Sequence, residues 1–323
     1  MSTEGGTRAV IAALLANTGI AVTKFIAAGI SGSASMLAEG VHSVADAGNQ
    51  VLLLIGGRRA RKAADAEHPF GYGRERYVFA FIVAIILFSV GGMFSLYEGW
   101  HKIQEYLAGH AEELNLPWIP LAVLAVAIVL ESLSLRTALI EANKARQGES
   151  LFAFIRHAKQ PELPVILLED LAALTGLVFA FAGVGLSLLT GNVIFDGIGT
   201  IAIGVLLVAV AVILGIETQS LLVGEGANRK DVAAIRAAFL AHEKVEAIIH
   251  MKTLYIGPDE LMVAAKVAVP KATKAADVAK MINSIERSVR EAVPVARTIY
   301  IEPDIYSAAT NTSTDAIVIP SHD

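Results

Sequence analysis

The sequence has no cysteine in its 323 residues, which excludes disulfides, thiolate zinc sites and cysteine nucleophiles. Any bound metal must therefore be held by His, Asp, Glu or backbone oxygen. Charge is also scarce: 18% of residues are charged and 54% are hydrophobic, whereas a soluble domain carries about a quarter charged residues. The net charge of −5 gives no reason to expect nucleic acid as a partner. The composition indicates a protein solvated largely by a lipid bilayer.

Long apolar windows fill the chain up to residue 222. A helix that spans the hydrocarbon needs roughly 20 apolar residues. Six windows reach this length, at residues 9–30, 34–57, 78–99, 117–139, 163–189 and 193–222. Because no small-residue cleavage site follows the first window, we expect a retained helix and not a signal peptide. The sequence therefore predicts a multi-pass integral membrane protein, with a six-helix transmembrane domain at residues 8–222.

Basic residues are distributed unevenly among the connections. The connections after the second and fourth windows are rich in them: Arg58, Arg59, Arg61, Lys62, Arg74 and Arg76, then Lys144, Arg146, Arg156 and Lys159. The connections after the first and fifth windows have no Lys or Arg, and the loop at 101–116 has only Lys102. Because basic loops stay on the cytoplasmic side, both chain ends are predicted to be cytoplasmic.

Residues 223–306 have the frequent charges of a separate soluble domain. The patterns predict a helix capped by Asn228, strands at 245–256 and 261–269 joined by a Gly-Pro-Asp turn, a helix at 275–291 and a strand at 295–301. This αββαβ order favours a small open-faced sandwich with both helices on one side of the sheet. The Ser/Thr/Ala-rich tail at 307–323 is predicted to be disordered.

Charged side chains inside the membrane are costly, so those in the apolar windows need a reason. Glu39, His42 and Asp46 are spaced by three and four residues, which places them on one face of the second helix. Glu169 and Asp170 interrupt the fifth window. Because neighbours on a helix point about 100° apart, at most one of these two acids faces the second helix squarely.

A metal site between the second and fifth helices would give these residues a role. The His42 imidazole and carboxylate oxygens from Asp46 and Asp170 would form a tetrahedral site with three or four ligands, which suits zinc. Calcium and magnesium prefer more oxygen ligands than these positions supply. A purely structural network of hydrogen-bonded polar side chains is the alternative interpretation.

Three motifs resemble the cation diffusion facilitator family. The run ASMLAEGVHSVADAGNQ from Ala34 to Gln50 resembles the family's second helix, in which a His-x-x-x-Asp or Asp-x-x-x-Asp pair binds metal. The segment HPFGYGRER from His68 to Arg76 is similar to the family's cytoplasmic segment before the third helix. Phe195-Asp-Gly-Ile-Gly199 resembles part of its sixth helix. The likeness to the family extends beyond these motifs, from about residue 8 to 305.

The resemblance implies a homodimer in membrane lipid and a cytoplasmic dimerisation domain of metallochaperone-like, or ferredoxin-like, fold. It also implies efflux of divalent metal ions against protons by alternating access. His42 and Asp46 match the family's second-helix pair, and Asp170 matches its fifth-helix Asp. Many relatives have a further ligand four residues earlier, where this chain has Ile166, so one ligand is missing or is replaced by Glu169. Glu39 is a further candidate ligand on the second helix. His42 favours Zn²⁺, with manganese, iron, cobalt or nickel as alternatives.

Further candidates follow from the same resemblance. His68 with Asp65 or Glu67 resembles a loop where some relatives hold a second metal, and solvated polar side chains without a metal are the alternative. Only His250 and Glu302 fall where relatives have cytoplasmic zinc ligands, so weak or no binding is expected there. Arg74 is expected to pair with Glu225 and hold two protomers together.

Protons compete with metal for His42 and the carboxylates, and this competition would couple metal export to proton entry. A membrane protein that senses metal without transporting it remains an alternative class. An enzyme is not expected, because an intramembrane metallohydrolase would usually carry a signature such as His-Glu-x-x-His, which the sequence lacks.

Overall fold

A computed structural model describes residues 3–110, 116, 118–146 and 148–306, with side chains from residue 17 onward. The described chain divides into two compact units. The first contains the residues up to Arg59 and then Arg76–Gln219, and the second contains Ala60–Glu75 and the chain from Ser220 onward. The predicted disordered tail at 307–323 lies outside the described residues.

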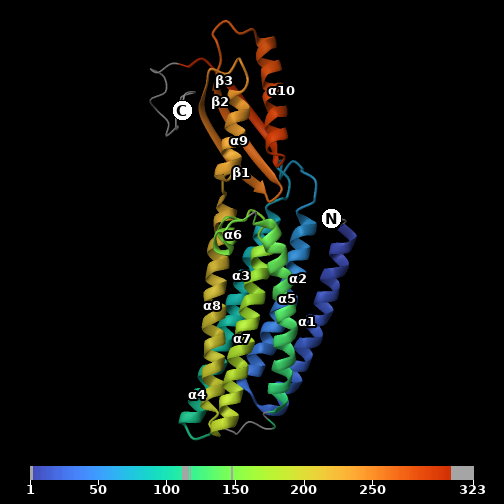
Figure 1. Ribbon diagram of the computed structural model, residues 1–323, viewed down its shortest axis with the longest axis vertical. Coiled ribbons are helices and arrows are strands. Elements are labelled where there is room, and N and C mark those ends of the chain that lie inside the picture. Colours follow the sequence, from blue (N-terminus) through green and yellow to red (C-terminus); the bar gives the residue numbers. More distant parts are fainter. Residues whose placement is uncertain (1–2, 111–115, 117, 147, 307–323) are drawn as a thin grey trace. The chain divides into compact units, whose positions relative to one another are not determined.

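The first unit is a bundle of long helices (Figure 1). They are α1 (Thr3–Ser31), α2 (Ala34–Arg59), a third span in three parts, α5 (Trp118–Ala145), α7 (Glu162–Thr190) and α8 (Ile194–Val223). They coincide with the six predicted windows, and a short helix that the sequence analysis did not predict, α6 (Leu151–His157), lies in the fourth connection. Four described helices, including the third span, are long and apolar enough to cross a membrane by length and hydropathy alone. The polar face of α2 lowers its mean hydropathy.

The third span, Glu75–Leu107, is not the regular helix that the sequence predicts. It consists of α3 (Glu75–Ile86), a π-helical segment η1 (Leu87–Met93) and α4 (Phe94–Leu107). Glycines bring this span close to α8: a Cβ on Gly92 would lie 2.7 Å from Val208 Cγ2, and one on Gly99 would lie 2.8 Å from the Gly197 carbonyl oxygen. Larger side chains at these glycines would push the two spans apart.

Hydrogen bonds to Asp196 link the start of α2 to α8. Asp196 is fully buried in the first turn of α8. Its carboxylate accepts hydrogen bonds from Ser33 Oγ at 2.9 Å and from the backbone N–H groups of Ala34 at 2.6 Å and Ser35 at 3.3 Å. The first N–H groups of a helix lack partners within it, and the positive end of the helix dipole favours an anion there. Asp196 therefore caps α2 from a neighbouring helix.

The starts of α3 and α7 are joined by an ion pair. Arg76 Nε and Nη2 donate to the two carboxylate oxygens of Glu162, the second at 2.9 Å. The Tyr77 hydroxyl donates to the Lys159 carbonyl oxygen at 3.2 Å next to it. Two parallel N–H donors fix the relative direction of the side chains as well as their distance.

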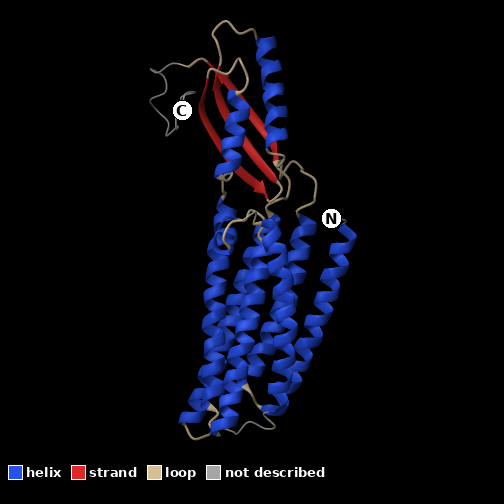
Figure 2. Ribbon diagram, in the orientation of Figure 1, coloured by secondary structure: helices blue, strands red, loops and turns tan. Residues whose placement is uncertain are grey.

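The second unit has the predicted αββαβ order. Figure 2 shows its strands in red and its helices in blue. Its elements are α9 (Arg229–Leu240), β1 (Ala247–Gly257), β2 (Glu260–Ala268), α10 (Ala275–Ala292) and β3 (Ala296–Asp304). The strand order is β1-β2-β3, with β2 antiparallel to β1 and parallel to β3. The predicted cap is confirmed, because Asn228 Oδ1 accepts from the Asp231 N–H at 2.8 Å.

One core joins the sheet to both of its helices. Alternate β2 residues, such as Leu261 and Val263, are fully buried together with Phe239 of α9 and Ile285 of α10. The intervening β2 residues are only half-buried. This alternation is the pattern of a sheet covered on one face, as the sequence predicts.

The segment Ala60–Glu75 belongs to the second unit through a close backbone approach. A Cβ on Gly73 would lie 3.0 Å from the Gly257 Cα, and a Cβ on Gly257 would lie 2.8 Å from the Gly73 Cα. Only glycine permits this distance. The contacts thus divide the chain differently from the predicted boundaries at residues 8–222 and 223–306.

Candidate metal site

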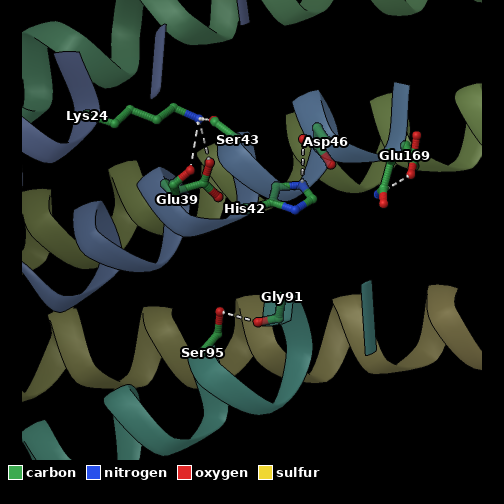
Figure 3. A network of polar contacts seen from close by, with 9 residues as sticks. Lys24, Glu39, His42, Ser43, Asp46, Gly91, Ser95 and Glu169 are labelled. Carbon is green, nitrogen blue, oxygen red and sulfur yellow. Dashed lines mark hydrogen bonds and ion pairs between the residues drawn. The ribbon is translucent and has the colours of Figure 1, made fainter. Parts of the chain in front are cut away.

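The centre of the site is the pair His42 and Asp46 on α2. Their spacing of four residues puts both on one face, and His42 Nε2 lies 3.5 Å from Asp46 Oδ2. The His42 side chain is buried, and Asp46 is largely so. Figure 3 shows the pair between a Lys24–Glu39–Ser43 group on one side and Glu169 on the other.

Several polar atoms of this pair have no hydrogen-bond partner. These atoms are the two ring nitrogens of His42 and the Oδ1 of Asp46. All three are buried, and none has a hydrogen-bond partner in the part of the chain that the structure describes. Buried polar groups are nearly always satisfied, so orphan atoms require an explanation. An imidazole nitrogen and a carboxylate oxygen with free lone pairs are ligands that zinc accepts.

The neighbouring acids on α7 face different helices. Glu169 is buried and accepts a hydrogen bond from Asn49 Nδ2 of α2 at 2.7 Å. Asp170 accepts from Ser134 Oγ of α5 at 2.9 Å. In this conformation Glu169 thus accepts its hydrogen bond from an α2 side chain, and Asp170 accepts its hydrogen bond from an α5 side chain.

The three predicted ligands do not form a closed site in this conformation. Among the described residues, no three His, Asp or Glu side chains are close enough together to hold one metal ion. The structure brings His42 and Asp46 together, whereas Asp170 hydrogen-bonds to α5. The site of His42, Asp46 and Asp170, with Glu169 as a further ligand, stays a prediction.

Glu39 has a different partner from the one the sequence suggests. Its Oε2 lies 3.0 Å from the ammonium of Lys24 on α1, and both side chains are fully buried. Lys24 Nζ also donates to Ser43 Oγ at 2.8 Å. The shared face of Glu39 and His42 on α2 is real, but the carboxylate of Glu39 pairs with α1.

The loop residues Asp65 and His68 belong to a local hydrogen-bond network. Asp65 Oδ2 accepts from the Tyr72 hydroxyl at 2.7 Å and from Lys62 Nζ at 3.0 Å, while Oδ1 accepts from the His68 N–H at 2.9 Å. The hydrogen bonds from Tyr72 and Lys62 hold the pKa of Asp65 well below its usual range. His68 Nδ1 lies 3.5 Å from Asp65 Oδ1, and both carboxylate oxygens of Asp65 also accept hydrogen bonds. A metal bound by Asp65 and His68 stays a prediction.

Replacing Asp65 by Asn is expected to raise amide hydrogen exchange in residues 64–72 about tenfold at pH 7, because the charged acceptor is lost. Since the folded pKa is lowered, the stabilisation is fully present above the unfolded value near 3.9 and is lost as the pH falls through the folded pKa. The ratio of variant to wild-type exchange should thus stay constant from ~pH 5 to 8. Glu67→Gln, an exposed neighbour, is the control; equal protection in D65N and wild type would contradict the role of Asp65.

His250 and Glu302 are separated by a lysine in the sheet. Lys266 of β2 pairs in register with His250 of β1 and with Glu302 of β3. Its ammonium lies 3.1 Å from Glu302 Oε1 and 3.0 Å from Asp304 Oδ2. The hydrogen bond from Lys266 lowers the pKa of Asp304. One ammonium therefore pairs with both acids of this row. Weak or no metal binding by His250 and Glu302 stays a prediction.

Arg74 and Glu225 both lie in the second unit near the residue that follows α8. Arg74 Nη2 lies 3.9 Å from the position that a Cβ on Gly224 would take. Glu225 Oε1 accepts from Ser220 Oγ, and the Glu225 carbonyl oxygen accepts from the Tyr255 N–H at 2.8 Å. The ion pair between protomers stays a prediction.

Three further polar residues of the bundle are functional candidates that the sequence did not predict. Lys24 is a buried cation in the first window, Glu131 is a half-buried acid of α5, and Asp196 caps α2. A signal existed for all three, because each is a charged residue inside an apolar window. No sequence pattern indicates that Asp196 caps a helix so distant in the chain.

The fold and the site together define a multi-pass helical membrane protein with a polar centre inside the bundle and a small α+β domain. Two family models match the chain: the cation efflux transmembrane domain at residues 10–223 and the cytoplasmic domain of cation efflux proteins at residues 227–304. The chain belongs to the cation diffusion facilitator family.

Curated relatives are similar over much of the chain. The mitochondrial proton-coupled zinc antiporter SLC30A9 of Xenopus laevis is 30% identical over 269 residues, which are 83% of this chain and 47% of that protein. Metal tolerance protein C4 of Arabidopsis thaliana is 32% identical over 78% of this chain and 54% of its own length. An uncharacterized transporter of Methanocaldococcus jannaschii is 25% identical over 91% of this chain and 96% of its length. The chain spans about half the length of the first two relatives.

Proposed function

We propose that this protein is a proton-coupled antiporter that exports a divalent metal ion, zinc, from the cytoplasm. The observation that carries the proposal is the buried pair His42 and Asp46, whose unpartnered nitrogen and oxygen atoms lie together on a membrane-spanning helix. The names of the first two relatives, a zinc antiporter and a metal tolerance protein, support the same class of substrate.

The ligand set favours zinc over harder ions. One imidazole and carboxylate oxygens suit Zn²⁺, whereas Ca²⁺ and Mg²⁺ prefer oxygen-rich sites with more ligands. Manganese, iron, cobalt and nickel remain competing substrates, because geometry and availability decide among divalent metals more than affinity does.

Transport requires α7 to supply a carboxylate to the α2 pair. In the described conformation Asp170 is hydrogen-bonded to α5 and Glu169 to Asn49. A shift of α7 against α2 would bring Asp170, or a released Glu169, to His42 and Asp46. A metal that binds the closed arrangement more tightly would stabilise it, and protons would compete for the same ligands on the acidic side.

The proposal includes the arrangement of the protein in its membrane. Both chain ends lie in the cytoplasm, since the basic loops are those that follow α2 and α5. Two copies form a homodimer, in which Arg74 of one protomer pairs with Glu225 of its partner. The match of residues 227–304 to the family's cytoplasmic domain supports this assembly.

Zinc uptake into vesicles tests the function. The purified chain is reconstituted into liposomes with an acidic lumen, and Zn²⁺, Mn²⁺, Fe²⁺, Co²⁺ and Ni²⁺ are added outside in turn. Zinc should accumulate inside while protons leave, and a protonophore should stop the accumulation. Tight zinc binding without flux would instead identify a metal-sensing membrane protein.

A further inference from the structure

A lysine is buried in α1 beside the candidate metal site. The Lys24 side chain is 1% exposed, and its ammonium contacts Glu39 Oε2 at 3.0 Å and Ser43 Oγ at 2.8 Å, both on α2. It also lies 3.5 Å from the Glu39 carbonyl oxygen. An unpaired charge at this depth would be prohibitively costly, so the lysine and the glutamate depend on each other.

Glu39 is placed where it could compete for the metal. It precedes His42 by three residues, so the two side chains start from the same face of α2, about one turn apart. Its second oxygen, Oε1, is buried without a hydrogen-bond partner in the described part of the chain. This oxygen lies against α7, 2.7 Å from the position that a Cβ on Gly176 would take. The first oxygen of Glu39, Oε2, contacts the Lys24 ammonium of α1 at 3.0 Å (Figure 3).

We infer that Lys24 is a specificity-determining residue, which holds Glu39 out of the coordination sphere of an ion at His42 and Asp46. The inference rests on the proposed transport function. The lysine limits the ligands from α2 to one imidazole and one carboxylate, and it cancels the negative charge of Glu39. Both effects favour zinc, which accepts few mixed ligands, over ions that prefer more oxygen donors.

Loss of the lysine would change the ligand chemistry in a definite direction. The Glu39 carboxylate would be free to turn toward His42 and add an oxygen donor and a negative charge. Manganese prefers carboxylate oxygen more than zinc does, so it would gain relative to zinc. Removing Glu39 at the same time would remove the gain.

The test is the ratio of zinc to manganese uptake by reconstituted protein. Lys24→Met is expected to lower this ratio roughly tenfold. The double variant K24M/E39Q should return it to within about threefold of the wild-type value, since it has neither the freed carboxylate nor a net charge change. Ser43→Ala is the matched control, because it removes a Lys24 contact but leaves the ion pair, and its ratio should equal that of wild type.

A merely structural role for Lys24 would lower the amount of folded protein and the uptake of both metals equally. An unchanged ratio in folded K24M would therefore overturn the inference.

If K24M does not fold, the double variant decides, because replacing a buried ion pair by neutral groups is often tolerated. A loss of zinc affinity of more than about tenfold in K24M/E39Q would overturn the inference as well, since Glu39 would then be a ligand already. Wild-type protein that moves neither metal would refute the transport function itself.

Discussion

Replacing Asp46 by Ala is expected to reduce proton-driven zinc uptake at least about a hundredfold. The change removes the carboxylate whose Oδ2 lies 3.5 Å from His42 Nε2 and leaves α2 with one ligand. A single imidazole together with one α7 carboxylate is too few donors for a tetrahedral ion in a membrane. The measurement is initial zinc uptake by vesicles with an acidic lumen.

Glu105→Ala is the control for this variant, since Glu105 is a half-exposed acid at the end of α4 that pairs with His101 at 3.8 Å. It should transport at the wild-type rate. The folding of D46A is checked by size-exclusion chromatography and thermal unfolding, and the buried side chain should tolerate truncation because its Oδ1 has no partner in the described structure. Wild-type flux from folded D46A would refute the role of this pair.

Replacing Asp196 by Ala is expected to destabilise the protein by about 3–5 kcal/mol and to lower its apparent Tm on the order of 10 °C. The fully buried carboxylate accepts from Ser33 Oγ and from the N–H groups of Ala34 and Ser35. Alanine would leave these donors unsatisfied at the start of α2, and each lost hydrogen bond to a charged group costs about 1.5–3 kcal/mol. Thermal unfolding of purified protein in detergent measures the effect.

Asp277→Ala makes the same chemical change at an exposed position. Asp277 lies in the first turn of α10, and its carboxylate is 3.6 Å from Lys244 Nζ at the surface. Such a pair contributes about 0–1 kcal/mol, so the Tm should hardly move. If D196A were as stable as D277A, the carboxylate of Asp196 could not be the anchor of α2.

Much of the candidate site could be predicted because it depends on one helix. The spacing of His42 and Asp46 places both on one face wherever α2 lies, and the structure keeps them 3.5 Å apart. Glu39 shares that face, yet its carboxylate turns to Lys24, fifteen residues earlier on another helix. The spacing of residues along a helix predicts which face of the helix a side chain lies on, but it does not predict which side chain on another helix it contacts.

The sequence by itself determined the apolar spans and the αββαβ order, because hydropathy and periodicity are properties of neighbouring residues. The tertiary structure decided that Glu169 hydrogen-bonds to α2 and Asp170 to α5, that Lys24 neutralises Glu39, and that Asp196 caps a helix 162 residues away. These contacts depend on how each helix is rotated about its own axis and on which helices are neighbours. The packing of all the helices against one another determines that rotation. The residues around a polar side chain in one window therefore do not indicate which residue of another helix it contacts.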